Sequence, residues 1–224
     1  AVGNNTVVNV YDGAKIYQNG TSNYVGAIIG ASYNATLNIY GGEGKSAKCG
    51  IIVMSTGATI NVSGGEWTAN GDGTVAGGNQ GVLVSQNNRN ESGWACKSIL
   101  NVTGGTFKGG YNCYGMGPGV EADDAQINIK GGNFNANPTS YVAEGYMAVE
   151  NNGVWNVVKA AAKIGEQGYA SLEAALAAEG NEVELLATYE VAAGETKTLD
   201  LKGKTVIGTP VEAKAYAVII NKGN

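Results

Sequence analysis

The sequence contains no histidine, a single arginine (Arg89) and few charged residues of either sign. Charged residues make up only 15% of the chain and the net charge is -5, so no basic stripe is present that could bind phosphates. No run of apolar residues approaches the length that spans a bilayer. We therefore expect neither nucleic acid nor a membrane among the partners of this protein.

The sequence is also poor in cysteine, with Cys49, Cys96 and Cys113 far apart along the chain. Three scattered cysteines are too few for a zinc site or a disulfide framework, and at most one pair of them can form a bridge. We expect the cysteines to be small buried apolar residues, and we expect no metal ion or other cofactor.

Glycine, by contrast, is abundant, and many of the 36 glycines belong to one recurring pattern. The pattern is an Asn, a β-branched residue, a variable residue and two glycines. Its copies are NIYGG (Asn38 to Gly42), NVSGG (Asn61 to Gly65), NVTGG (Asn101 to Gly105), NIKGG (Asn128 to Gly132) and a degenerate NVYDG (Asn9 to Gly13). Each copy ends a stretch in which apolar and polar residues alternate, which predicts a strand with one buried face. The glycines predict a corner, because they permit positive φ and carry no Cβ.

A second apolar strand is predicted after each corner. The segments are Gly26 to Ser32, Gly50 to Thr56, Gly81 to Asn87 and, more weakly, Gly119 to Asp123. Each repeat would then form a coil of at least two strands and two corners, and stacked coils would share one core. The sequence therefore predicts an all-β dominated fold with a right-handed parallel β-solenoid over residues 1–136.

The recurring Asn has a structural interpretation in such a stack. Its amide could bond to the Asn of the coils above and below, which would form a polar ladder. A surface row of Asn and Thr that binds ice or a crystalline polysaccharide is the alternative. Copies that begin at positions 9, 38, 61, 101 and 128 are too unevenly spaced for a regular lattice. We therefore favour the ladder.

The pattern changes after residue 136. Alternating residues on both sides of Asn151 to Gly153 predict a closing hairpin over residues 137–160. Residues 161–197 are predicted to form a small α/β connector, with a helix from about Ser171, its N-cap, to Ala178 and a strand from about Glu182 to Ala187. Residues 198–224 are predicted to contain strands at Thr198 to Leu201 and Tyr216 to Asn221 that open a further solenoid.

These segments together resemble a known family over nearly the whole chain. The coils INVSGGEWT and LNVTGGTF, the closing segment from NIKGGNF to GVWNV, the connector KIGEQGYASLEAALAAEGNEVELLA and the coil opening TLDLKGKTVIGT carry the resemblance. They are similar to the β-solenoid repeat regions of large secreted, wall-attached bacterial surface proteins, often called adhesin-like or pectate-lyase-like. The resemblance implies an extracellular or cell-surface location and a structural or adhesive role.

In that family the usual order is connector, opening coil, further coils and closing hairpin, so this chain starts within a solenoid and ends on an opening coil. Two open, complementary edges would follow. We expect the chain to join copies of itself head to tail, or to adjoin covalent repeat neighbours in a longer protein. The residues expected at this contact are Val7, Val8, Val10, Val218, Ile219 and Ile220.

An enzyme is a second possibility, because polysaccharide lyases and hydrolases also use parallel β-helices. The candidate carboxylates are Asp123 and Asp124 beside Glu121, and Glu43 with Glu66, which stacked corners would place near Thr106 and Asn133. Without a perturbing pocket these groups have no reason to act as acid or base. We assign no catalytic residue and expect no enzymatic activity, because the chain has no His, one Arg and no convergent carboxylate cluster. We interpret the GDG at 71–73 as a turn rather than a calcium loop.

A carbohydrate-binding module is the third possibility. Aromatic side chains in the loop-rich middle coils could form a platform for sugar rings. These candidates are Trp67, Trp94, Phe107, Tyr111 and Tyr114, and the longest coil, from Asn61 to Leu100, is the preferred ligand surface.

Overall fold

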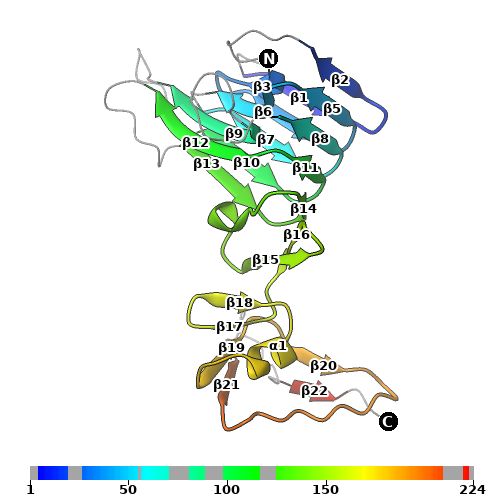
Figure 1. Ribbon diagram of the computed structural model, residues 1–224, viewed down its shortest axis with the longest axis vertical. Coiled ribbons are helices and arrows are strands. Elements are labelled where there is room, and N and C mark those ends of the chain that lie inside the picture. Colours follow the sequence, from blue (N-terminus) through cyan, green and yellow to red (C-terminus); the bar gives the residue numbers. More distant parts are fainter. Residues whose placement is uncertain are drawn as a thin grey trace. The chain divides into compact units, whose positions relative to one another are not determined.

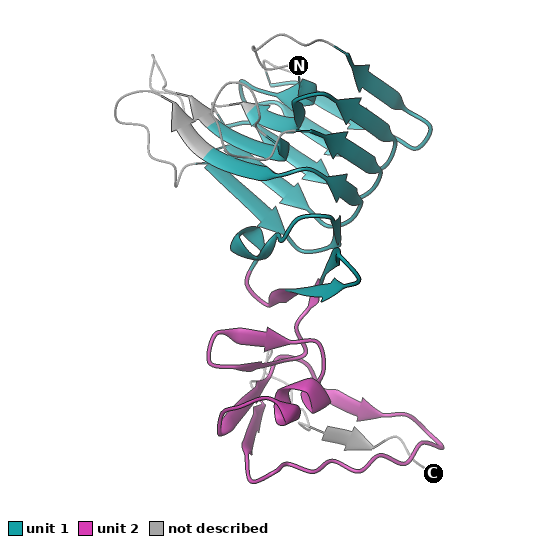
Figure 2. Ribbon diagram, viewed as in Figure 1, with its two compact units in different colours: residues 1–143, 148–157 teal, residues 144–147, 158–224 magenta. Residues whose placement is uncertain are grey.

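Strands dominate both compact units of the protein. The computed structural model describes residues 5–19, 27–54, 57–70, 81–88, 98–116, 125–208 and 219–221 (Figure 1). Unit 1 comprises residues 1–143 and 148–157, and unit 2 comprises residues 144–147 and 158–224 (Figure 2). Within the described ranges, α1 (Leu172–Ala177) is the one α-helix. The prediction of an all-β dominated fold with parallel sheets is confirmed.

Unit 1 contains three parallel sheets, which we call sheets 1, 2 and 3. Sheet 1 has the order β1 (Val7–Val10), β4 (Thr36–Ile39), β7 (Thr59–Val62), β10 (Ser98–Val102) and β13 (Ala125–Ile129). Sheet 2 contains, in parallel, β2 (Lys15–Gln18), β5 (Glu43–Ser46), β8 (Glu66–Ala69), β11 (Thr106–Lys108) and β14 (Gly132–Phe134). Sheet 3 contains β3 (Ala27–Ala31), β6 (Cys49–Met54), β9 (Gly81–Asn88) and β12 (Tyr111–Met116). The chain visits the three sheets in the same order on each pass (Figure 1).

The passes differ in one respect from the sequence-based expectation. The first four passes, or coils, have three strands each and the fifth has β13 and β14, because the stretch after the glycines forms a strand of sheet 2 that the sequence did not indicate. In sheet 3 the fourth strand is β12, which pairs with β9. The predicted strand segment Gly119 to Asp123 lies outside the described residues.

The core of unit 1 follows the alternation of the strands. In sheet 1 the buried column contains Leu37, Ile60 and Leu100, which are register partners, and the next inward column contains Ile39 and Val62. Burial of these aliphatic side chains stabilises the stack in proportion to the apolar area removed from water. The outward residues between the two columns are the recurring asparagines.

The segment that follows β14 pairs with β14, the last parallel strand of sheet 2, and bridges to one residue of β13, the last strand of sheet 1. Strand β16 (Val154–Lys159) pairs antiparallel with β14, and β15 (Tyr146–Asn151) lies beside β16. Asn152 and Gly153, with φ of 52° and 80°, form the turn between them, as a two-residue hairpin turn requires. After the short 3-10 helix η2 (Thr139–Tyr141), Val142 bridges to Ile129 at the end of β13.

Unit 2 has its own small core and a second set of parallel pairs. Its main sheet has the order β18 (Gln167–Tyr169), β17 (Ala162–Ile164), β19 (Glu182–Leu185) and β21 (Thr205–Gly208). Strand β19 pairs in parallel with β21, and β20 (Tyr189–Val191) pairs in parallel with β22 (Ile219–Asn221). The first strand of unit 2 with a parallel partner is therefore β19, which lies within the predicted connector, residues 161–197.

The helix prediction for unit 2 is confirmed in detail. The Ser171 hydroxyl accepts a hydrogen bond from the backbone N–H of Ala174 at 3.1 Å, so Ser171 is the N-cap of α1. The buried face of the helix consists of Leu172, Ala175 and Leu176. The prediction of a strand at Thr198 to Leu201 is wrong: this segment has no strand pairing, and β21 begins at Thr205 instead.

Candidate functional site

The corners between sheets 1 and 2 form a groove that crosses the stacked coils. The first glycine of each corner packs closely on the coil before it. A Cβ on Gly64, Gly104 or Gly131 would overlap the backbone carbonyl of Tyr40, Ser63 or Thr103, respectively. The second glycine adopts positive φ, for example 94° at Gly65 and 108° at Gly105. The corners with two glycines therefore carry no side chains, whereas the first corner carries Asp12, and a groove of about 590 Å³ runs along the corners.

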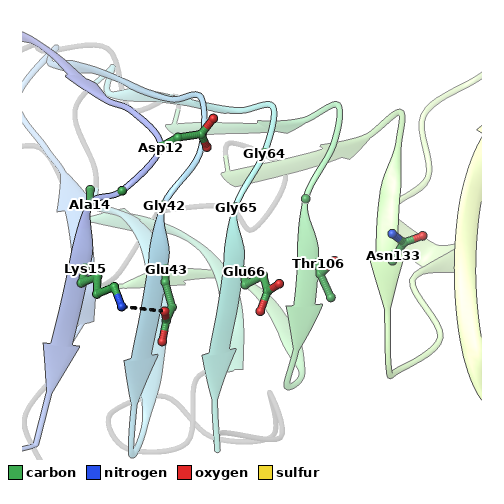
Figure 3. A pocket seen from close by; sticks show the side chains of 12 residues that line it. Asp12, Ala14, Lys15, Gly42, Glu43, Gly64, Gly65, Glu66, Thr106 and Asn133 are labelled. Carbon is green, nitrogen blue, oxygen red and sulfur yellow. Dashed lines mark ion pairs between the residues drawn. The ribbon is translucent and has the colours of Figure 1, made fainter.

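Polar side chains from successive strands of sheet 2 line one side of this groove, which we call the corner groove. They are the register partners Lys15, Glu43, Glu66, Thr106 and Asn133 (Figure 3). The proximity of Glu43, Glu66, Thr106 and Asn133 that the sequence predicted from stacked corners is thus confirmed. Asp12, at the corner of the first coil, adds a further carboxylate to the lining.

Glu43 is the most extensively bonded of these side chains. It accepts a hydrogen bond from the Tyr17 hydroxyl at 2.8 Å, and its carboxylate oxygens lie 3.4 Å from Lys45 Nζ and 3.9 Å from Lys15 Nζ. The Tyr17 hydrogen bond, followed by the two lysines, lowers the pKa of Glu43 and keeps the carboxylate ionised. The same hydrogen bond raises the pKa of Tyr17. Glu43 is therefore held as an oriented anion at the side of the groove.

Two of the predicted glycan-contact aromatics are in the core, so their assignment is wrong. Trp67 is 1% exposed and Phe107 is fully buried, and the two are register partners in sheet 2. Phe107 stacks on Phe134 with 5.1 Å between ring centroids, and the Trp67 indole N–H donates to the carbonyl oxygen of Gly64 at 3.0 Å. Gly44 leaves the space that the Trp67 ring fills. A buried ring cannot provide a face to a sugar.

Of the remaining predicted aromatics, the structure describes the side chain of Tyr111. Tyr111 is half-buried, its hydroxyl donates to the carbonyl oxygen of Ala136 at 2.8 Å, and its ring packs edge-on against Phe134 and Tyr141. Trp94 and the side chain of Tyr114 lie outside the described residues.

Among the described residues of unit 1, the exposed aromatic side chains are tyrosines outside the predicted set. Tyr11 and Tyr40 follow the last residues of β1 and β4, stack with 5.2 Å between ring centroids and 14° between planes, and are 61% and 50% exposed. The period-two pattern of the strands would have revealed them, since Val10 and Ile39 point inward and the next residue must point outward.

The predicted asparagine ladder is confirmed along the outer face of sheet 1. Each side-chain amide donates to the Oδ1 atom of the Asn one coil earlier, at 2.9 to 3.2 Å. The members are Asn9, Asn38, Asn61, Asn101 and Asn128. The repeat of Asn at this position therefore has a structural reason, in addition to the packing of the glycines.

The residues predicted for a head-to-tail contact lie partly on an open edge. Strand β1 is the outermost strand of sheet 1, with Val7 63% exposed, Val8 half-buried and Val10 buried in the core. Val10 therefore contributes to the core of its own coil. Val218 and the side chains of Ile219 and Ile220 lie outside the described residues, although β22 itself pairs with β20.

The other candidate chemical groups are buried or not described. Cys49 is buried and Cys113 is half-buried, both as free thiols, and burial raises their pKa to about 12 and about 11, respectively. No group of three or more His, Cys, Asp or Glu side chains within the described ranges is arranged to hold a metal ion. Cys96, Glu121, Asp123, Asp124 and residues 71–73 lie outside those ranges.

Comparisons with known proteins identify no relative of this chain. No protein-family model, curated protein or solved structure matches the chain. Among the residues that the structure describes, no helix is long and apolar enough to cross a membrane.

Proposed function

We propose that the three parallel sheets are the faces of a right-handed β-solenoid and that the protein is a non-enzymatic structural unit of an extracellular bacterial surface fibre or adhesin. In this proposal, neighbouring subunits join head to tail through the edges of their solenoids. The neighbouring subunit is another copy of the chain or a covalent repeat in a longer protein. The resemblance of the coil, closing and connector segments to wall-attached surface proteins supports the extracellular location.

The observation that carries the proposal is the difference between the two ends of the stack in unit 1. At one end, β16 covers β14 and Val142 bridges to β13. At the other end, no strand of the described residues lies beyond β1, β2 or β3 in their sheets. An uncovered parallel edge is a template for strand addition, which proteins normally block unless it is used.

The edge at β1 is prepared for a further parallel strand. The carbonyls of Thr6 and Val10 accept hydrogen bonds from the backbone N–H groups of Thr36 and Tyr40, so they face β4. Because alternate residues of a strand direct their backbone groups to opposite sides, those of Val7 and Asn9 face away from β4. The Asn9 amide nitrogen also stands at the outer end of the asparagine ladder.

Strand β21 of unit 2 fits this edge as the partner strand. It is the outermost strand of its sheet, and its first three residues are exposed, half-buried and exposed, as are those of β1. Aligned in parallel, its Val206 would face Val8, while Ile207, which is 41% exposed, would lie opposite Asn9. The half-buried Val8 and Val206 of two edge strands would then pack against each other.

Cysteine crosslinking tests this contact. In the full chain with Cys49, Cys96 and Cys113 replaced by Ala, the pair Asn9→Cys and Ile207→Cys should give a ladder of disulfide-linked multimers on non-reducing gels. The control pairs Asn9→Cys with Leu201→Cys, an exposed residue of unit 2 outside the strands. Equal yields from both pairs would refute pairing of β21 with β1.

Two further measurements test the assembly as a whole. Deletion of residues 198–224 should leave monomers, and fibres that persist after the deletion would contradict strand completion. Mass spectrometry of the native source then separates the two kinds of neighbour. A discrete species of 22.8 kDa supports assembly of copies, and a much larger polypeptide supports covalent repeats.

A further inference from the structure

We propose that the corner groove binds a linear, electrically neutral polysaccharide that lies along the stacking direction of the coils. Three features suit such a ligand: a floor of glycine corners, a wall of polar side chains, and an exposed aromatic pair, Tyr11 and Tyr40, which directly precedes the first two corners in sequence but lies outside the groove lining. This site differs from the predicted platform in the middle coils, and it does not depend on the head-to-tail contact.

The floor of the groove is kept open by packing within the stack. The glycines cannot be replaced by larger residues, because a Cβ at Gly64, Gly104 or Gly131 would overlap the backbone of the preceding coil. The groove extends from the corner of Asp12 to that of Asn133, and at its first end the Asp12 carboxylate lies over Gly41. Five coils at the spacing of paired strands give a length of about 19 Å, which accommodates several sugar rings in a row.

The polar wall provides groups that bind hydroxyls. Glu43 and Glu66 supply carboxylate oxygens, Thr106 supplies a hydroxyl and Asn133 supplies an amide, each on a successive strand of sheet 2 (Figure 3). Carboxylates accept hydrogen bonds from hydroxyl groups, and an amide both donates and accepts. Glu43 is already oriented by Tyr17, so less of its side-chain freedom would be lost on binding.

The charge of the lining selects against acidic polysaccharides. Asp12, Glu43 and Glu66 are carboxylates, and the one lysine of the lining, Lys15, already lies 3.9 Å from Glu43. Uronate or sulfate groups in the groove would lie near these carboxylates and be repelled. A neutral chain of hydroxyl-bearing rings avoids this cost.

The aromatic pair provides a face for a sugar ring. Tyr11 stacks on one face of Tyr40, and the next residue in the same row is Ser63, as the adjacent register pair of Ile39 and Val62 shows. Because Ser63 is small, the other face of Tyr40 is not covered by an aromatic neighbour in this row. Apolar faces of sugar rings pack on such rings, while hydroxyls at their edges reach polar groups.

Titration calorimetry with defined oligosaccharides tests the proposal. The full chain is titrated with cello-, xylo-, manno- and chito-oligosaccharides, and with oligogalacturonate as the acidic counterpart. We expect saturable binding of at least one neutral probe and none of oligogalacturonate. Tyr40→Ala and Glu66→Gln should each weaken binding about tenfold, which corresponds to about 1.4 kcal/mol.

Tyr33→Ala is the matched control for Tyr40→Ala. Tyr33 is 53% exposed and lies before β4, at the opposite end of that strand from Tyr40. Its replacement should leave the affinity unchanged. The proposal is overturned if no neutral probe binds, if oligogalacturonate binds equally well, or if Tyr33→Ala weakens binding as much as the two groove variants do.

Discussion

The asparagine ladder should contribute measurably to the stability of unit 1, and its centre should contribute more than its end. Asn61 donates to Asn38 Oδ1 at 3.0 Å and accepts from Asn101 Nδ2 at 3.0 Å, so Asn61→Ala removes two hydrogen bonds. Asn9 takes part in one, at 2.9 Å, and is exposed. Asn9→Ala therefore removes one bond and leaves only Asn38 without its acceptor.

A magnitude follows from the number of bonds. The net contribution of a protein hydrogen bond is about 0.5–1.5 kcal/mol, so Asn61→Ala should lower the free energy of unfolding by about 2 kcal/mol. Asn9→Ala should lower it by about 1 kcal/mol or less, because its amide is in contact with solvent. The two variants remove the same atoms, so the difference between them measures the ladder rather than side-chain size.

Unfolding in guanidinium chloride, monitored by tryptophan fluorescence, measures this difference in the stability of unit 1. All three tryptophans, Trp67, Trp94 and Trp155, belong to unit 1, so the signal does not report on unit 2. With an m-value of about 4 kcal/mol/M, Asn61→Ala should lower the midpoint by about 0.5 M. A midpoint for Asn61→Ala at or above that of Asn9→Ala would refute the stabilising role of the ladder.

Three further predictions concern a corner, a carboxylate and a thiol. Gly104→Ala should destabilise unit 1 by about 3 kcal/mol in the same titration, because the added Cβ overlaps the carbonyl of Ser63. Tyr17→Phe should raise the pKa of Glu43 toward its ordinary value in a carboxyl NMR titration, since the lost hydrogen bond is the largest cause of the lowered pKa. In the wild type, the stability that Glu43 contributes is present above its ordinary pKa and is lost as pH falls through the lowered one. Cys49, whose pKa burial raises to about 12, should resist alkylation at mildly alkaline pH until the chain unfolds, as mass spectrometry of the labelled protein would show.

The first two of these predictions have a matched control, and the third has an outcome that would contradict it. Thr103→Ala, beside Gly104, removes only a long side-chain hydrogen bond of 3.4 Å and should cost less than about 1 kcal/mol. Lys15→Ala should raise the pKa of Glu43 less than Tyr17→Phe does, since the charge of Lys15 lowers that pKa less than the Tyr17 hydrogen bond does. Rapid alkylation of Cys49 in the folded chain would contradict its burial in sheet 3.

The sequence by itself determined the features that depend on local chemistry. The alternation before each pair of glycines predicted the strands of sheet 1, and the Asn at the third position predicted a ladder that forms with bonds of 2.9 to 3.2 Å. Ser171 and the apolar positions after it predicted α1. Each signal lies within a few residues, because strand period, corner geometry and helix capping are properties of neighbouring residues.

The tertiary structure alone decided that each coil has a strand in sheet 2, and it alone decided the surroundings of the aromatic residues. Segments such as Glu43–Ser46 and Thr106–Lys108 are short and have little alternation of their own, so they become strands by pairing with the coils on either side. The corner also sets which side of sheet 2 faces inward. Trp67 and Phe107 follow their glycines into the core, whereas Tyr11 and Tyr40 precede theirs and remain exposed. Which aromatic residues can contact a ligand depends on which face of each strand points inward. That choice is fixed by stacking between coils that are distant in the sequence.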